Sequence, residues 1–131
     1  MQTTKIVTAS IAVKHNRVLI TRRASGQSLA GYWEFPGGKV EPGETLQDCL
    51  HRELLEELGV ESIIGGVFAE SLYDYAHGSI KLIGLSTELA HNDFILTVHD
   101  RADWVPFDQL LSYQLAPADI PIARKLLELI E

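Results

Sequence analysis

Residues 38–60 read GKVEPGETLQDCLHRELLEELGV, and they contain the clearest structural pattern in the chain. Positions 45–58 contain neither glycine nor proline, and leucine recurs at 46, 50, 54 and 58. That spacing predicts one helix with a leucine stripe facing the core. Thr45 with Asp48 three residues later indicates an N-terminal capping box, and Gly59 indicates the C-terminal stop.

The acidic side chains of this helix form a second pattern. Glu53, Glu56 and Glu57 stand at i, i+3 and i+4, inside an arc of roughly 100° beside the leucine stripe. Like charges four residues apart destabilise a helix by about 0.2–0.5 kcal/mol. Carboxylates near the C-terminus of a helix meet the negative end of its dipole, which costs about 0.3–1 kcal/mol each. A hard divalent cation offsets these costs because it binds carboxylate oxygens. A solvated acidic face is the alternative, which the helix taken alone favours.

The surrounding residues favour the cation. Gly38, Glu44 and the run RELLEELGV at 52–60 resemble the complete box that defines the Nudix family, each position at its proper spacing. TRR at 21–23, WEFPGGKVE at 33–41 and LAPADIP at 115–121 are similar to the MutT-type nucleoside triphosphate pyrophosphohydrolases. The last segment is most similar to bacterial CTP pyrophosphohydrolases. The resemblance covers most of the chain and implies a Nudix α/β/α sandwich with a mixed β-sheet between helices.

The resemblance also implies the roles of individual residues. Metal, expected to be Mg2+ with Mn2+ as a substitute, would bind the Gly38 carbonyl and the carboxylates of Glu53, Glu56 and Glu57. Arg52 and Glu44 would orient these ligands through charge-assisted hydrogen bonds. The residues expected to contact the substrate are Arg23, Glu34, Phe35, Lys39 and Asp119.

The general base is not settled by the resemblance. MutT relatives carry a further glutamate before the strand that contains Trp104, and this chain has Val98 at that place, followed by His99 and Asp100. Asp100 can take the role after a small loop shift, and histidine commonly transfers protons near neutral pH. Either residue equally fits a solvated loop. One of the helix glutamates is the remaining candidate.

Asp119 bears on the base of the substrate. It lies at the start of the predicted last helix, where capping is the simplest role. In MutT this place holds an asparagine that recognises an oxidised guanine. An ionised aspartate only accepts hydrogen bonds, so it favours an exocyclic amine, as on cytosine or adenine, unless its pKa is raised enough for it to donate.

We therefore expect Mg2+-dependent hydrolysis of nucleoside triphosphates to the monophosphate and pyrophosphate, with CTP-like pyrimidines favoured. The first alternative is a MutT-type 8-oxo-dGTP diphosphatase that removes oxidised nucleotides. Another nucleoside diphosphate derivative, such as ADP-ribose or a nucleotide sugar, is a second enzymatic option. A noncatalytic nucleotide-binding module is the alternative of a different class, although such relatives typically lose the acids that this chain keeps.

Composition sets further bounds. The length of 131 residues predicts a single domain, residues 1–131. A net charge of −7 argues against a nucleic acid polymer as partner, because such binding rests on a basic surface. The single Cys49 excludes an internal disulfide and suits a reducing cytoplasm. No signal peptide or 18-residue apolar run is present, so no membrane association is expected. We expect a cytoplasmic monomer or homodimer.

The other elements follow from local patterns. The expected extended segments are 5–14, 17–23, 60–75, 80–89 and 104–107. His15-Asn16 predicts a hairpin turn, and Gly65-Gly66 predicts a bend in the third segment. Pro117 is expected to start a last helix with the apolar stripe Ile122, Ala123, Leu126, Leu127 and Ile130. Residues 90–103 show no clear pattern.

Overall fold

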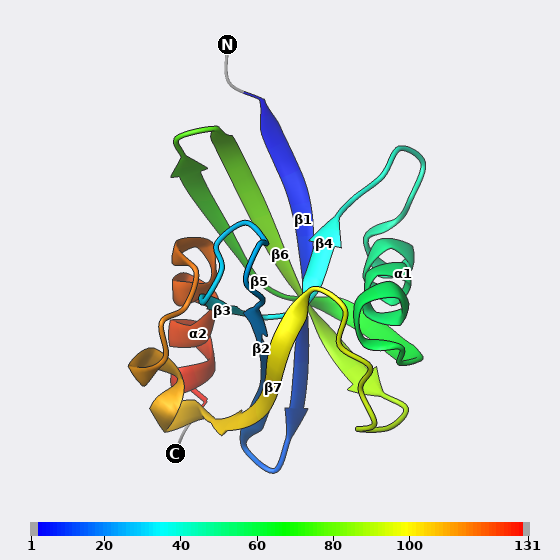
Figure 1. Cartoon of the computed structure of the whole chain (residues 1–131), viewed down its shortest axis with the longest axis vertical. Helices are drawn as coiled ribbons and strands as arrows, with labels where there is room; N and C mark the ends of the chain where they lie inside the picture. The colour runs from blue at the N-terminus through cyan, green and yellow to red at the C-terminus, as the bar shows by residue number, and fades with distance from the viewer. Residues whose placement is uncertain (1–2, 130–131) are drawn as a thin grey trace.

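The computed structural model describes residues 3–129, and its first helix forms as predicted. Helix α1 (Leu46–Leu58) lies on one side of the molecule (Figure 1). The Thr45 hydroxyl accepts a 3.0 Å hydrogen bond from the Asp48 N–H, and Gly59 ends the helix with a left-handed φ of 64°. Leu50, Leu54 and Leu58 are fully buried, so the leucine stripe faces the core.

The sheet is mixed. Its strands are β1 (Thr4–Lys14), β2 (Arg17–Arg23), β3 (Trp33–Glu34), β4 (Gly37–Lys39), β5 (Ser62–Tyr75), β6 (Gly78–Leu89) and β7 (His99–Pro106). They run in the order β3-β2-β1-β6-β5, with β4 paired to β1 and β7 paired to β2. Strands β1 and β6 are parallel, and the other strand pairs are antiparallel. This confirms the predicted α/β class.

The β1–β2 hairpin is closed by the predicted turn. His15 and Asn16 both have positive φ, 54° and 60°, which is the conformation that suits the right-handed twist of a two-residue hairpin. Strand β4 approaches β1 so closely that a Cβ on Gly37 would lie 2.0 Å from the carbonyl oxygen of Thr8. A glycine is therefore required where β4 joins the sheet.

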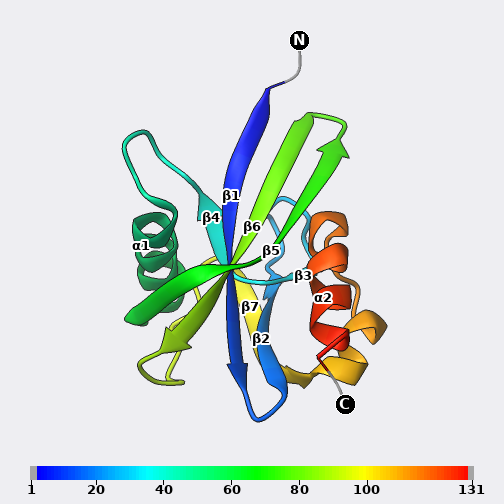
Figure 2. The same cartoon turned by 180° about the vertical axis from the view of Figure 1, so that it is seen from behind.

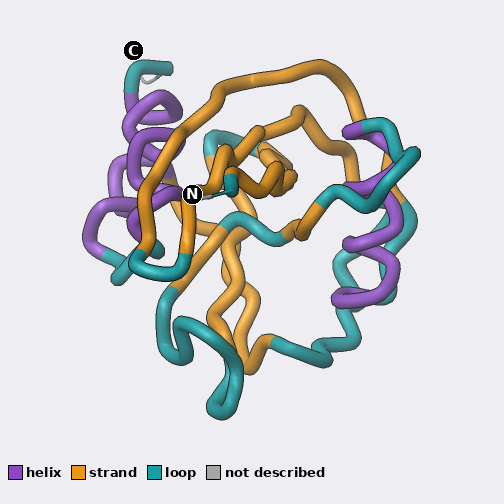
Figure 3. The backbone as a smooth tube through the Cα atoms, turned by 90° about the horizontal axis from the view of Figure 1, so that it is seen from above, coloured by secondary structure: helices purple, strands orange, loops and turns teal. Residues whose placement is uncertain are grey.

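Helices cover both faces of the sheet. Helix α2 (Ile120–Leu127) lies on the side opposite α1 when the molecule is viewed from the front, from behind and from above (Figures 1, 2 and 3). Leu50, Leu54 and Leu58 pack in one core cluster with residues of the sheet, and Ile122 and Leu126 pack in a second. The α/β/α arrangement is thus confirmed. Ile130, expected in the α2 stripe, lies outside the described residues.

The C-terminal third differs from the sequence prediction in two places. Strand β7 begins at His99, so the prediction of a strand starting at position 104 was wrong. Residues 100, 101 and 103 are charged, and this masked the alternation of a strand that pairs along the whole of β2. Pro117–Asp119 forms a 3-10 turn, so α2 starts at Ile120 rather than at the proline. A second 3-10 helix, Phe107–Ser112, follows β7.

None of the described helices is both long enough and apolar enough to cross a membrane.

Candidate active site

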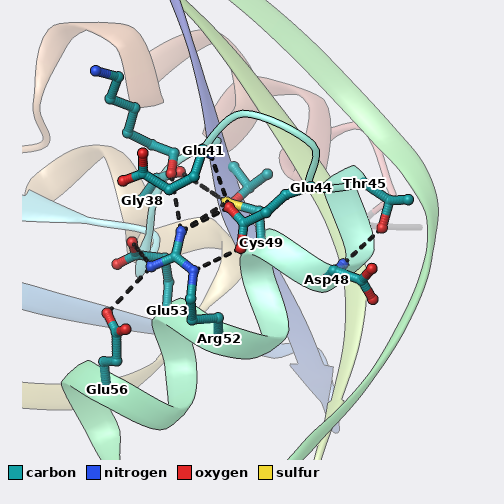
Figure 4. Close-up of polar contacts among 11 residues, drawn as sticks. Gly38, Glu41, Glu44, Thr45, Asp48, Cys49, Arg52, Glu53 and Glu56 are labelled. Atoms are coloured by element: carbon teal, nitrogen blue, oxygen red, sulfur yellow. Dashed lines mark hydrogen bonds and ion pairs between the residues drawn. The ribbon is translucent and has the colours of Figure 1, made fainter.

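Arg52 is the centre of a charged network on α1 (Figure 4). Its Nε lies 2.6 Å from Glu44 Oε2, and its Nη2 lies 2.8 Å from Glu44 Oε1, so the guanidinium donates two hydrogen bonds to this carboxylate. Its Nη1 lies 2.8 Å from Glu53 Oε1 and 3.3 Å from Glu56 Oε2. One arginine therefore connects three of the acids that the sequence placed in the site.

Glu44 is held as a carboxylate. The Arg52 guanidinium first, and then the backbone N–H of Glu41, lower the pKa of Glu44 to about 2. Arg52 also donates to the carbonyl of Lys39 at 3.2 Å, which fastens α1 to the end of β4. The Lys39 side chain is exposed there. The pair of Arg52 and Glu44 thus fixes α1 against the end of β4.

Gly38 lies directly against Glu53. A Cβ on Gly38 would be 2.2 Å from Cδ of Glu53, so any larger residue would push this carboxyl group aside. The Gly38 carbonyl accepts a hydrogen bond from the Thr8 hydroxyl at 3.2 Å and one from the Cys49 thiol at 3.5 Å. The absence of a side chain at position 38 brings a carbonyl oxygen and a carboxylate to the same place.

Glu57 carries the most perturbed carboxyl group on α1. Burial first, and then the charges of Glu34 and Glu53, raise the pKa of Glu57 to about 8. Its Oε2 is buried and has no hydrogen-bond partner among the described residues. Burial also raises the pKa of Glu53, against the opposing effect of Arg52. Two neighbouring carboxyl groups therefore lack sufficient compensating positive charge.

Glu34, which the resemblance implied as a substrate contact, lies close enough to Glu57 for its charge to raise the pKa of that group. Its Oε2 accepts a 2.8 Å hydrogen bond from Nε2 of His99 and a 3.5 Å bond from Nη1 of Arg23. The His99 side chain is fully buried, at 0% exposure. The sequence left His99 open between a candidate base and a solvated loop residue, because nothing local signals that β7 begins there and that the ring is buried.

Asp100 lies apart from this cluster. The register shift between β2 and β7 leaves Asp100 without a partner residue on β2, between Arg101 and the buried His99. The Asp100 carboxylate, 44% exposed, bonds Arg22 Nε at 2.7 Å, and this pairing lowers the pKa of Asp100. The structure therefore does not bring Asp100 to the acids of α1.

Asp119 lines a cavity of about 90 Å³ together with Glu34, Phe35 and Tyr75. Its side chain makes no capping bond to α2, so the capping interpretation was wrong. Instead Asp119 is 5% exposed, and its Oδ2 accepts a 2.9 Å bond from the Phe35 N–H. Burial first, and then the charge of Glu34, raise the pKa of Asp119 well above its ordinary value. Glu34 thus lies close both to Glu57 and to this cavity.

A family model described as the NUDIX domain matches residues 3–128. The chain belongs to the Nudix family. It is 36% identical to the CTP pyrophosphohydrolase of Escherichia coli K12 over 116 residues, 88% of this chain and 86% of that protein. It is 30% identical to the 8-oxo-dGTP diphosphatase of the same organism, over 96% of this chain and 98% of that protein.

A solved structure supports the same assignment. The solution structure of the ORF135 protein of E. coli matches with a TM-score of 0.85 and 33% identity, over 98% of this chain and 91% of that one. This chain is accordingly a Nudix hydrolase, a member of a family whose relatives are named for hydrolysis of acid anhydrides.

Nudix hydrolases generally use divalent metal ions. Within residues 3–129, no three His, Cys, Asp or Glu side chains converge in the geometry of a completed metal site. Glu56 instead reaches Arg52 and is 58% exposed. The donors nevertheless fit such an ion, because Glu57 Oε2 is buried with no partner in the described part of the chain and Glu53 lies against Gly38. All of these donors are oxygen atoms, the ligands of a hard cation.

Proposed function

We propose that this Nudix hydrolase cleaves nucleoside triphosphates to the monophosphate and pyrophosphate with Mg2+, and that it prefers CTP-like pyrimidines. The buried carboxyl group of Asp119 in the cavity beside Phe35 carries the proposal. The resemblance of LAPADIP to bacterial CTP pyrophosphohydrolases supports it, as does the 36% identity to the enzyme named for that reaction.

The protonation state of Asp119 determines which base it complements. A neutral carboxyl group donates through one oxygen and accepts through the other, whereas a carboxylate only accepts. Cytosine presents a ring nitrogen acceptor beside an exocyclic amine donor, so the neutral form makes two hydrogen bonds with it, whereas the ionised form expected from the sequence would accept from the amine alone. Burial and the neighbouring charge of Glu34 favour that neutral form. Oδ2 already accepts from Phe35 and keeps a second lone pair for the amine, while Oδ1 remains for the ring nitrogen.

The second candidate is the 8-oxo-dGTP diphosphatase activity. The corresponding edge of an 8-oxoguanine base presents two neighbouring N–H donors, which match an ionised Asp119. The 30% identity to the enzyme named for that substrate, over nearly the whole chain, favours this candidate. A noncatalytic binding module is disfavoured because Glu44, Arg52 and the three α1 glutamates are all retained.

Different residues of the chain have different roles in the proposed reaction. Glu53, Glu56, Glu57 and the Gly38 carbonyl would hold Mg2+, which neutralises phosphate oxygens and activates water when bound. Arg52 and Glu44 keep Glu53 in place. Because Asp100 pairs with Arg22, we assign the acceptance of the water proton to one of the α1 glutamates. Arg23 is the cation expected to contact the substrate, and Phe35 lines the cavity for the base.

A substrate panel tests the proposal. We expect kcat/KM with Mg2+ to be higher for CTP and 5-methyl-dCTP than for dGTP and 8-oxo-dGTP, with pyrophosphate as the released product. A strong preference for 8-oxo-dGTP would overturn the pyrimidine assignment. Glu53→Gln should abolish pyrophosphate release, whereas His51→Gln should not, because the exposed His51 side chain pairs with Glu61 beyond the end of the helix. Undiminished hydrolysis by Glu53→Gln would refute the metal assignment.

A further inference from the structure

We propose that His99 is a positioning residue, which holds Glu34 so that its free oxygen faces the nucleoside part of the substrate. The inference rests on the proposed function. It concerns the contact between two residues that are 65 positions apart in the chain. Neither residue belongs to the box of residues 38–60.

The burial of His99 calls for an explanation. Its ring is 0% exposed, its Nε2 lies 2.8 Å from Glu34 Oε2, and its Nδ1 is buried without a partner in the described chain. A buried polar atom that lacks a partner destabilises a fold, and an apolar residue would avoid that cost. The bond to Glu34 is an interaction that an apolar residue at this position could not provide.

The register between β2 and β7 determines the direction of the His99 ring. Pairing between β2 and β7 is regular up to Arg22 and Arg101, and then shifts so that Arg23 faces His99. Such irregularities redirect side chains at the end of a ladder. His99 and Arg23 consequently approach the same oxygen of Glu34 from neighbouring strands.

Arg23 and His99, the two donors to Glu34, differ in their other hydrogen-bond partners. Arg23 reaches Glu34 at 3.5 Å and also donates to the Ser28 carbonyl at 3.2 Å and to Gln27 Oε1 at 3.4 Å. His99 makes the shorter bond, and its Nε2 bonds Glu34 alone among residues 3–129. The orientation of Glu34 therefore depends chiefly on His99.

Glu34 is placed to contact the nucleoside. It precedes Phe35, whose N–H bonds Asp119, and it lines the same cavity. Its side chain is 20% exposed, and His99 and Arg23 both bond Oε2, which leaves Oε1 as the oxygen that would meet a ligand. A carboxylate repels phosphate oxygens but accepts from hydroxyl or amine groups. Glu34 should thus bind a ribose hydroxyl or a base amine.

Steady-state kinetics tests this assignment with CTP and Mg2+. His99→Leu removes the donor, and we expect KM to rise about tenfold, the ratio for one lost hydrogen bond to a charged group, with little change in kcat. His99→Gln places an N–H near the position of Nε2 and should restore most of the affinity. Asp103→Asn is the matched control on β7, because Asp103 pairs with the exposed Arg101. Its KM should not change.

A double-mutant comparison separates positioning from a general structural role. In a Glu34→Gln background, His99→Leu should add little to KM, because the residue through which His99 acts is already altered. An equal further rise in KM in that background would overturn the proposal. So would an unchanged KM in a folded His99→Leu variant.

Nitrogen NMR of the ligand-free protein gives an independent readout. The geometry requires the His99 proton on Nε2, and Glu34→Gln should shift that ring resonance. An unprotonated Nε2, or ring resonances whose chemical shifts do not change in Glu34→Gln, would overturn the proposal even if His99→Leu fails to fold. A wild-type protein that hydrolyses none of the triphosphates would defeat the proposed function, while the NMR result would still report on the contact.

Discussion

The backbone N–H of Phe35 donates a 2.9 Å hydrogen bond to Oδ2 of Asp119, 84 residues further along the chain. Neighbouring backbone bonds support this contact, since the Trp33 N–H donates to the Gln114 carbonyl and the Ala116 N–H donates to the Trp33 carbonyl. The LAPADIP segment is thereby fastened alongside β3, and the Asp119 carboxyl group is buried at the cavity proposed for the base.

The pH dependence of base preference should report on Asp119. As pH rises through its raised pKa, the neutral form that matches cytosine is replaced by the carboxylate that matches 8-oxoguanine. We expect the ratio of kcat/KM for CTP to that for 8-oxo-dGTP to fall with rising pH. The ratio cancels effects common to both substrates. In Asp119→Asn, which donates and accepts at every pH, the ratio should be flat; a slope equal to that of wild type would contradict this assignment.

The stability of the fold should depend on the same group. The folded pKa of Asp119 lies above the ordinary value of 3.8, so the folded protein retains a proton that the unfolded chain loses. Protonation of Asp119 therefore stabilises the fold. This contribution to the free energy of unfolding is fully present below pH 3.8 and is lost as pH rises towards the folded pKa. Asp119→Asn should therefore become progressively more stable relative to wild type over that range. Urea denaturation at a series of pH values measures the difference, and parallel curves for the two proteins would argue against it.

Substitution of two adjacent glycines should separate stability from activity. In Gly37→Ala the new Cβ meets the backbone of Thr8 at 2.0 Å, which cannot yield without separating β4 from β1. We expect the free energy of unfolding to fall by about 1–3 kcal/mol. In Gly38→Ala the Cβ meets the side chain of Glu53, which can move aside, so kcat/KM should fall about 100-fold with less loss of stability.

Gly66→Ala is the control for both glycine variants, because a Cβ there meets nothing within 4 Å. Thermal unfolding and initial rates on the three variants check the prediction. Equal activity in Gly38→Ala and Gly66→Ala would show that the contact between Gly38 and Glu53 does not matter for the reaction.

Arg52→Lys should impair the reaction although charge is conserved. Lysine cannot make the two parallel bonds to Glu44 while also holding Glu53. We expect kcat/KM to fall by about 10–100-fold, with saturation shifted to higher Mg2+ concentration. Titration of activity against Mg2+ measures both effects, and His51→Gln, one residue away, should match wild type. Wild-type Mg2+ dependence in Arg52→Lys would remove Arg52 from the role of orienting the ligands.

The sequence alone determined α1, its caps at Thr45 and Gly59, and the placement of the acids on one part of the helix. It also determined the β1–β2 hairpin through His15 and Asn16. Helical period, capping and turn conformation depend on residues within a few positions of one another, so these features can be read locally. The family resemblance of residues 38–60 rests on the same kind of local spacing.

Tertiary structure decided what the site residues face. Whether His99 or Asp100 points inward depends on the register between β7 and β2, which is set by pairing across the sheet. The raised pKa of Asp119 depends on burial beside Glu34, and the partner of Glu34 comes from a strand that local pattern did not reveal. Contacts of this kind form only when distant segments pack together, and the chemistry of the carboxyl groups follows from that packing rather than from their spacing in the chain.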